Sequence, residues 1–285
     1  MGINVKDVDF SYNRKRKNNS YLFNKLNIDI NSTDEFITVV GTTGSGKSTF
    51  AQMLNALLLP IHGCIYISDY KVLPKHNKNL KKVRKEVGLV FQFPEYQLFE
   101  ESVIKDVMFG PLNYKIKKDQ ALKQAQESLE KLHFDKKLYD VPPFNLSGGQ
   151  KRLVSIAGIL ALNPNVIIFD EPTVGLDYKA KQLLINILKM LHKDYHKTII
   201  VITHDMNFVA ENAKRVVVFN NGNITYDGNT IDLFNDKEFL KNNNLDLPFI
   251  ASMAEGLKES GLINYDKIPL TTDELERVIR GDHHE

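Results

Sequence analysis

Cysteine and tryptophan are nearly absent from this chain of 285 residues, which has one cysteine, Cys64, and no tryptophan. A single cysteine excludes an internal disulfide and any zinc site built on paired cysteines, and it fits a reducing compartment. We therefore predict that Cys64 is a small buried apolar residue, in a strand at residues 64–67.

Long apolar runs and targeting segments are missing as well. The longest apolar stretch, residues 153–162, is far shorter than the ~20 residues that cross a bilayer. The first ten residues carry charges at Lys6, Asp7 and Asp9 and no apolar core of signal-peptide length. The net charge is only +2, which gives no reason to expect nucleic acid as the main partner. These absences predict a cytoplasmic chain that acts at a membrane only through partner subunits.

Short apolar runs alternate with segments of helical periodicity, and this alternation predicts an α/β fold with a largely parallel sheet. The runs at residues 166–169 and 198–202 are continuously apolar, as in strands covered on both faces. Residues 3–10 and 26–30 alternate apolar and polar positions, which indicates half-buried strands. The other predicted strands cover 36–40, 64–67 and 87–91, and the predicted helices cover 50–59, 118–132, 152–162 and 183–191.

Several polar stretches have plain structural interpretations. Residues 14–19 are predicted to be a solvated hairpin tip. Residues 75–85 are basic, and we interpret them as the exposed face of a short helix, with weak attraction to acidic lipid headgroups as the alternative. The C-terminal part reads as short helices, the last of which opens with a capping box of Thr271 and Glu274. The closing residues 283–285 are interpreted as a frayed terminus rather than a metal site.

A glycine-rich stretch with a lysine follows the predicted strand at 36–40 and leads into a predicted helix. Its members are Gly41, Thr42, Thr43, Gly44, Ser45, Gly46, Lys47, Ser48 and Thr49. Strand, turn and helix in this order are the context in which G-x-x-x-x-G-K-[ST] binds nucleotide phosphates, and a chance glycine-rich turn would lack that context. The loop N–H groups and the helix N-terminus attract an anion, Lys47 supplies a charge for the β- and γ-phosphates, and Ser48 is placed to bind Mg²⁺. The sequence therefore predicts a nucleoside triphosphate site.

Two adjacent carboxylates, Asp170 and Glu171, follow the buried run at 166–169. Asp170 is placed to hold Mg²⁺, usually through water, and Glu171 can accept a proton from an attacking water. An acid pair can also simply favour a helix N-terminus. Beside a phosphate loop, the catalytic interpretation is the stronger one.

A second anion-binding turn precedes the predicted helix at 152–162. It consists of Ser147, Gly148, Gly149 and Gln150, after Leu146. The Ser147 side chain and the two glycine N–H groups present another helix terminus that can hold an anion.

With these motifs in this order, residues 1–230 resemble the nucleotide-binding domain of the ATP-binding cassette (ABC) ATPases. The resemblance implies a P-loop NTPase core with a mostly parallel sheet, an antiparallel β subdomain, and a helical subdomain at about 93–162. It also implies a small helical C-terminal domain at 231–285, and it makes the turn at 147–150 the signature motif.

The resemblance assigns roles to further residues. Gln92 would be the glutamine of the Q-loop, and Asp177 would belong to the D-loop. His204 would be the switch histidine that contacts the γ-phosphate. Tyr12 would be the aromatic platform for adenine, with Tyr21 as its rival, and stacking of about 1–3 kcal/mol discriminates poorly between bases. Taken alone, Tyr12 and His204 would be ordinary packing residues, and only their position relative to the motifs supports these roles.

A dimer is implied as well, in which each ATP lies between the phosphate loop of one subunit and the signature motif of the other. The chain has one phosphate loop and one Leu-Ser-Gly-Gly-Gln sequence, so a second nucleotide domain must come from another chain. That chain is either a copy of this one or a distinct ATPase, which would make a heterodimer.

Residues 91–101 narrow the resemblance to the ATPases of energy-coupling factor (ECF) transporters, particularly the second of their two ATPase subunits, and residues 106–111 and 147–161 continue it. In that family this region docks onto a transmembrane coupling subunit, and a separate substrate-binding membrane subunit captures a vitamin or a metal ion. The docking surface is assigned to Pro94, Tyr96, Gln97, Leu98 and Phe99.

This subfamily resemblance has two further implications and one departure. The C-terminal helices would serve subunit pairing, and the chain would be peripheral at the cytoplasmic face of the cell membrane. Thr42 stands where this subfamily commonly has histidine or asparagine, which affects the subgroup and not ATP binding.

Three interpretations from different classes follow. The first is the motor subunit of an importer. The second is a soluble cassette ATPase that acts on nucleic acid or ribosomes, which needs a long coiled-coil insertion or two fused cassettes; Lys47 and Ser147 are too close in sequence for the insertion. The third is a catalytically dead partner subunit, against which Lys47, Ser147, Glu171 and His204 all argue. We favour the importer motor.

The expected mechanism places the phosphates of MgATP on residues 44–48. Mg²⁺ would be held by Ser48, Gln92 and Asp170. Glu171 would deprotonate water while His204 stabilises charge that develops in the transition state.

Overall fold

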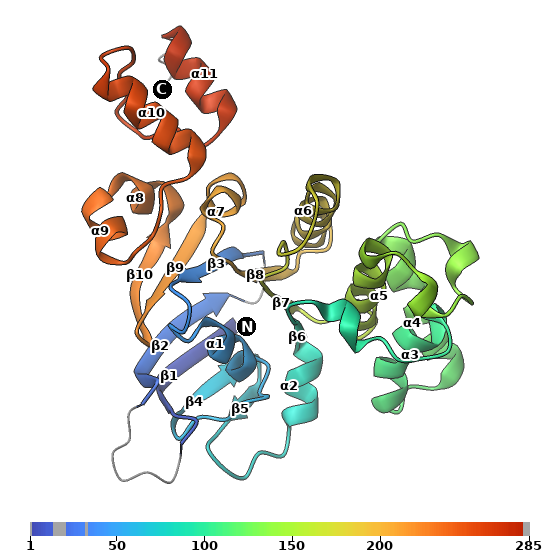
Figure 1. Cartoon of the computed structure of the whole chain (residues 1–285). Helices are drawn as coiled ribbons and strands as arrows, with labels where there is room; N and C mark the ends of the chain where they lie inside the picture. Colours follow the sequence, from blue (N-terminus) through green and yellow to red (C-terminus); the bar gives the residue numbers. More distant parts are fainter. Residues whose placement is uncertain (1, 14–20, 32–33, 282–285) are drawn as a thin grey trace.

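The computed structural model describes residues 2–13, 21–31 and 34–281. The predicted hairpin tip at 14–19 and the terminus at 283–285 lie outside these residues. Two sheets form the body of the molecule, a group of helices stands to one side, and the last helices lie at the far end (Figure 1).

The larger sheet has six strands in the order β10-β9-β3-β8-β7-β6. They are β3 (Phe36–Gly41), β6 (Val87–Val90), β7 (Val166–Asp170), β8 (Thr198–Ile202), β9 (Arg215–Asn220) and β10 (Asn223–Asn229). All neighbours are parallel except β10, which pairs antiparallel with β9 at the edge. Every residue of β7 and β8 is buried, as their continuous apolar runs indicate. The predicted α/β fold with a mostly parallel sheet is confirmed.

The smaller sheet is antiparallel, with the order β2-β1-β4-β5. Its strands are β1 (Gly2–Phe10), β2 (Phe23–Asn31), β4 (His62–Ile67) and β5 (Tyr70–Val72). Its buried side chains share one core cluster with helix α1 (Lys47–Leu54) and with Val39 and Ile168 of the larger sheet. The helix that follows the phosphate loop is therefore held between the two sheets.

Cys64 in β4 is only partly buried, so the prediction of a buried cysteine is wrong. Side chains alternate between the faces of a strand, and Ile65 and Ile67 occupy the core face. Cys64 therefore faces the other side, where its partner across the sheet is the exposed Lys6.

Two helices differ from their predicted bounds next to the motifs. α1 ends at Leu54 rather than residue 59, because Ala56 adopts a left-handed φ of 55° that a helix cannot continue through. α5 (Gly148–Leu160) begins at Gly148 rather than residue 152, because Ser147 caps it. The Ser147 hydroxyl accepts from the Gln150 N–H, and the Gln150 side chain accepts from the Ser147 N–H.

The helical group beside the sheets consists of α3 (Val103–Asn113), α4 (Lys118–Lys131) and α5, with the 3₁₀ turns η1 (Pro94–Gln97), η2 (Lys136–Leu138) and η3 (Pro143–Asn145) (Figure 1). Its apolar side chains form a second core cluster with Phe169 of β7 and with α6 (Tyr178–Lys193). α2 (Leu80–Glu86) covers only the second half of the basic stretch at 75–85.

The C-terminal part follows α7 (Met206–Asn212) and β10. It contains α8 (Thr230–Asn235), α9 (Lys237–Asn242), α10 (Phe249–Glu259) and α11 (Thr272–Arg280). The predicted capping box at the start of α11 is confirmed, with Thr271 and Glu274 bonded to each other's backbone N–H groups. Leu233 and Phe234 pack with Val216 and Val218 of β9, so this part continues the core of the sheet. Within the described residues, no helix combines the length and apolar character that crossing a membrane requires.

Candidate active site

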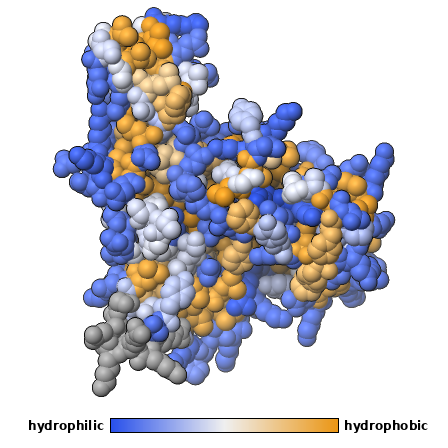
Figure 2. Space-filling view, in the orientation of Figure 1, coloured by the Kyte–Doolittle hydropathy of each residue, from blue (hydrophilic) through white to orange (hydrophobic). Residues whose placement is uncertain are grey.

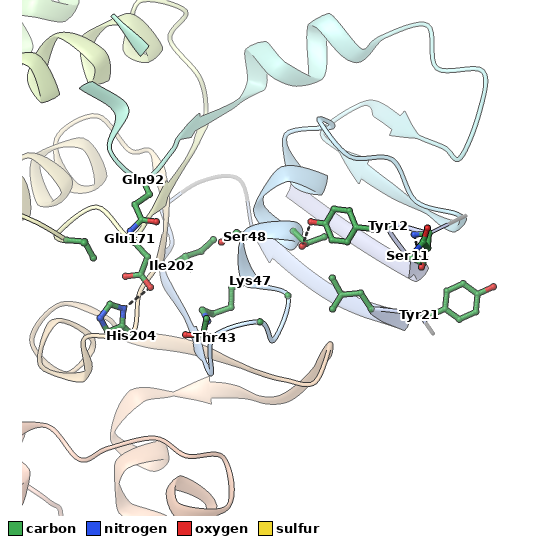
Figure 3. A pocket seen from close by; sticks show the side chains of 16 residues that line it. Ser11, Tyr12, Tyr21, Thr43, Lys47, Ser48, Gln92, Glu171, Ile202 and His204 are labelled. Carbon is green, nitrogen blue, oxygen red and sulfur yellow. Dashed lines mark hydrogen bonds and ion pairs between the residues drawn. The ribbon is translucent and has the colours of Figure 1, made fainter. Parts of the chain in front are cut away.

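A cavity of about 790 Å³ lies at the carboxyl ends of β3, β7 and β8, the edge of a parallel sheet where ligands bind. Its walls come from stretches far apart in the sequence (Figure 3). Lys47, Ser48 and Thr43 lie in the middle of the view, with Gln92, Glu171 and His204 on one side and Tyr12 and Tyr21 on the other.

The phosphate loop surrounds the ammonium group of Lys47. Lys47 Nζ donates to Gly41 O at 2.8 Å and to Thr42 O at 2.9 Å. Burial lowers the pKa of Lys47 below its ordinary value, and the nearby carboxylates of Glu171 and Asp170 oppose this shift. The loop therefore holds a partly desolvated cation, which suits the binding of a phosphate.

Two glycines of the loop occupy positions that no other residue fits. Gly41 has a φ of 140°, and a Cβ there would lie 2.0 Å from the carbonyl oxygen of Phe219. Gly46 has a φ of 109°, and its Cβ would lie 2.6 Å from the ring of Phe23. Glycine is therefore needed at the first turn of the loop and at its last residue. α1 begins directly after Gly46, and no side chain caps its N-terminus, so its N–H groups are available to an anion.

Asp170 is the last residue of β7 and is buried. Burial raises the pKa of its carboxyl group above the ordinary value, and a hydrogen bond with Ser48 opposes the rise. Its Oδ1 atom has no hydrogen-bond partner within the described part of the chain. A buried carboxylate oxygen of this kind is a group that a cation would satisfy.

Glu171 has a left-handed φ of 49°, a conformation that costs on the order of 1–3 kcal/mol for a residue with a side chain. Its N–H donates to Ile202 O at 2.9 Å, which ties this strained position to the end of β8. Glu171 Oε1 lies 2.9 Å from His204 Nδ1, while Oε2 is buried and without a partner among the described residues. The histidine thus orients a carboxylate that keeps one oxygen for another ligand, such as water.

Tyr12 lies at the other end of the cavity and is 67% exposed. Its hydroxyl is 2.7 Å from Thr49 Oγ1, and its ring packs nearly perpendicular to that of Phe10, with centroids 5.0 Å apart. These contacts fix an aromatic ring with an open face, as base stacking requires. Tyr21 lines the same cavity and packs against His62, so both candidates are near the site.

The residues present fit Mg²⁺ bound together with a nucleotide. The described residues contain no set of three His, Cys, Asp or Glu side chains that would hold a metal alone. Magnesium commonly takes one or two carboxylates and completes its shell with water and substrate phosphates. Ser48 and Gln92 line the cavity, and the carboxyl group of Asp170, which has the unpartnered Oδ1, is hydrogen-bonded to Ser48.

The predicted signature residues do not line this cavity. The described residues that form its walls include neither Asp177 nor any of residues 147–150. Ser147 is exposed at the start of α5, and Asp177 caps α6 by accepting from the Ala180 N–H at 2.8 Å. Ser147 and Asp177 are exposed on the surface, where they could contact a nucleotide bound to another chain.

The predicted docking surface divides into exposed and buried residues. Tyr96 is 84% exposed, and Gln97 and Phe99 are exposed as well. Pro94 is buried, and Leu98 is only 7% exposed and packs in the core of the helical group. The prediction that Pro94 and Leu98 contact a partner directly is therefore wrong: Pro94 at the start of η1 and Leu98, the extended residue that follows η1, are buried, whereas Tyr96 within the turn is exposed.

Several residues that line the cavity were not selected from the sequence. They are Ser11, Asn13, Leu22, Val174 and Ile202. Their types carry no particular phosphate or base chemistry, so only their proximity in sequence to Tyr12, Glu171 and His204 pointed to them.

Comparison of the sequence with protein families and with characterised proteins identifies the family of this chain. The sequence profile of the ABC transporter family matches residues 23–174. The chain is 43% identical over 280 residues to "Energy-coupling factor transporter ATP-binding protein EcfA2" of Caldanaerobacter subterraneus subsp. tengcongensis, which covers 98% of this chain and 97% of that protein. This similarity confirms the predicted resemblance to the second ECF ATPase subunit.

Solved structures agree with this placement. The structure of cbiO1 from Clostridium perfringens, described as part of the ABC transporter complex cbiONQ, has a TM-score of 0.73 at 34% identity and covers 89% of this chain and 98% of that one. A dimeric post-hydrolysis structure of the ATP-binding cassette MJ0796 with ADP and Pi has a TM-score of 0.69 at 29% identity, over 80% and 98%. The chain therefore belongs to the ABC transporter family of ATPases and, within it, to the ATP-binding proteins of ECF transporters.

Proposed function

We propose that this ATPase is one of two cassette subunits of an ECF-type importer and that its ATP hydrolysis powers uptake of a vitamin or another micronutrient. The similarity to an ECF ATP-binding protein over nearly the whole chain carries this proposal. That similarity favours the importer over a soluble cassette ATPase acting on nucleic acid or ribosomes. The contact between Glu171 and His204 beside Lys47 argues against a catalytically dead subunit.

In the proposed reaction the ATP phosphates bind the N–H groups of residues 44–48 and the ammonium group of Lys47. Glu171 accepts the proton of the attacking water through its unpartnered oxygen. His204 holds Glu171 in place and stabilises charge at the γ-phosphate.

Ser48, Gln92 and Asp170 are the residues that would hold Mg²⁺ beside the phosphates. When bound, Mg²⁺ neutralises phosphate charge during transfer. The buried, unpartnered oxygen of Asp170 supports this assignment.

A second cassette is part of the proposal because the signature turn is not among the described residues that line the chain's own cavity. Ser147, Gly148, Gly149 and Gln150 would close over a nucleotide bound to the partner, with Asp177 beside them. The partner is proposed to be a different ATPase chain, so that the pair is a heterodimer.

Exposed apolar side chains on α10, on α11 and in the segment between them support a role in this pairing. Phe249, Met253, Leu262 and Ile279 are exposed large hydrophobic residues there. Figure 2 shows apolar side chains gathered on this end of the molecule. Residues 231–285 are therefore proposed as a dimerisation region.

A transmembrane coupling subunit and a substrate-binding membrane subunit complete the proposed complex. Tyr96, Gln97 and Phe99 are the residues proposed to dock onto the coupling subunit, because their side chains are exposed and follow Gln92 of the site by a few positions in the sequence. The chain would then be peripheral at the cytoplasmic face of the cell membrane.

Affinity purification of the tagged chain from detergent-solubilised native membranes, with every co-purifying protein identified, tests the proposal. We expect a second, different cassette ATPase and a polytopic membrane protein. Recovery of the chain alone, or with ribosomes or DNA, would remove the importer role and leave the ATPase chemistry in place.

A further inference from the structure

Arg152, in the second turn of α5, is buried, and one edge of its guanidinium group donates two hydrogen bonds to a carboxylate. Its Nε and Nη2 atoms donate to the two oxygens of Glu95 at 3.2 and 3.1 Å. Its Nη1 atom donates to Pro172 O at 3.1 Å and to Val174 O at 3.4 Å. Buried arginine needs such partners, and the two-pronged pair fixes both distance and orientation.

These contacts join three segments that the site uses for different purposes. Glu95 belongs to η1, next to the exposed Tyr96. Arg152 follows Gln150 of the signature turn by two positions, and Pro172 directly follows Glu171. One guanidinium group thus connects the proposed docking turn, the signature helix and the catalytic segment.

We propose that Arg152 and Glu95 form a clasp that transmits the nucleotide state of the active site to the docking turn at residues 94–99. A shift of α5 or of the segment at 171–174 on nucleotide binding would move η1 with it, because the clasp holds all three together. Both are positioning residues, since neither is among the described residues that line the cavity. The inference rests on the proposed importer function, in which this turn contacts a membrane partner.

The surroundings of the clasp distinguish it from an ordinary surface pair. Glu101 and Lys105, for comparison, form an ion pair on exposed side chains, where solvent screening leaves the pair little stabilising energy. The side chains of Arg152 and Glu95 are largely withdrawn from water, so each depends on the other. A second contact, from Ser155 Oγ to Pro94 O at 3.0 Å, adds to the hold of α5 on the same turn.

Amide hydrogen exchange tests the clasp in the complex purified through a tag on this chain, with and without Mg²⁺ and ATPγS. In the wild type we expect nucleotide to slow exchange both in the phosphate loop and in the docking turn. In Glu95→Gln the slowing should remain in the phosphate loop and be lost in the docking turn. A purely structural contact would raise exchange in the turn equally with and without nucleotide. If Glu95→Gln gives this result and nucleotide still slows exchange in the docking turn as in the wild type, the clasp is overturned.

Further variants separate coupling from folding. Glu101→Gln is the matched control, because it makes the same change at an exposed pair, and it should behave as the wild type. Arg152→Lys keeps the positive charge but cannot form two parallel hydrogen bonds with Glu95, so most of the nucleotide-dependent slowing of exchange in the docking turn should be lost. The double variant Glu95→Gln/Arg152→Gln leaves no unpaired buried charge and should show the same loss.

The outcomes for the clasp and for the proposed function are distinct. If the folded double variant shows the same nucleotide-dependent slowing of amide exchange in the docking turn as the wild type, the clasp is overturned and the proposed function is not. A wild-type chain that recovers no membrane protein would overturn the proposed function, and with it the coupling role of the clasp.

Discussion

Replacing Leu98 by alanine should destabilise the helical group, whereas replacing Tyr96 by alanine should not. Leu98 packs in the cluster formed by α3, α4 and α5. Truncating a leucine in such a cluster costs about 2–5 kcal/mol, because lost burial and the remaining cavity add. Tyr96 is 84% exposed, with its ring centroid 6.1 Å from that of Phe93, so its loss should change stability by less than about 0.5 kcal/mol.

Urea unfolding of the purified chain measures this difference. With a denaturant slope of about 3 kcal/mol per M, a loss of about 3 kcal/mol lowers the midpoint for Leu98→Ala by roughly 1 M. Tyr96→Ala should keep the wild-type midpoint and ATP binding and should lose the membrane partner on affinity purification. A wild-type midpoint for Leu98→Ala would refute the assignment of this side chain to the core. Loss of ATP binding in the isolated Tyr96→Ala chain would refute the docking role.

Three further predictions concern the cavity itself. Lys47→Ala should weaken ATP binding by roughly 10- to 150-fold, the equivalent of about 1.5–3 kcal/mol of charge-assisted bonding, and an unchanged Kd in calorimetry would contradict the assignment. Tyr12→Ala should weaken ATP and GTP alike by about 1–3 kcal/mol, whereas Tyr12→Phe, which loses only the hydroxyl bond to Thr49, should cost about 1 kcal/mol or less; selective loss of one nucleotide would count against stacking. Because burial raises the pKa of Asp170, protonation as the pH falls should weaken Mg²⁺-dependent ATP binding at a higher pH than an ordinary aspartate would, and Asp170→Asn should remove that part of the profile. A binding profile that Asp170→Asn leaves unchanged would exclude this role.

The site could be predicted from the sequence where chemistry and position agree. Asp170 is the last residue of a buried strand, and Lys47 and His204 follow the ends of two others by a few positions. Parallel strands bring such ends to one edge of the sheet. The glycines of the phosphate loop carry a pattern that backbone sterics demand, as the close approach of Gly41 to Phe219 shows.

Burial within a short turn could not be predicted in this way. Tyr96 and Leu98 are both apolar and lie two positions apart, and the change from the 3₁₀ turn of η1 to the extended Leu98 decides which one enters the core. The prediction for Cys64 was wrong because it rested on residue type alone, whereas the alternation with Ile65 and Ile67 puts Cys64 on the opposite face of the strand. The pairing of Arg152 with Glu95 joins residues far apart in the chain, and no local pattern indicates it.

ATP hydrolysis by the purified complex tests the assignment of the reaction most directly, with Glu171→Gln in this chain and the matching substitution in its partner ATPase. We predict that ATP binding persists and that hydrolysis slows at least ~100-fold, the lower range for loss of a general base. Hydrolysis near the wild-type rate in that complex would contradict the role of Glu171 and the mechanism built on it.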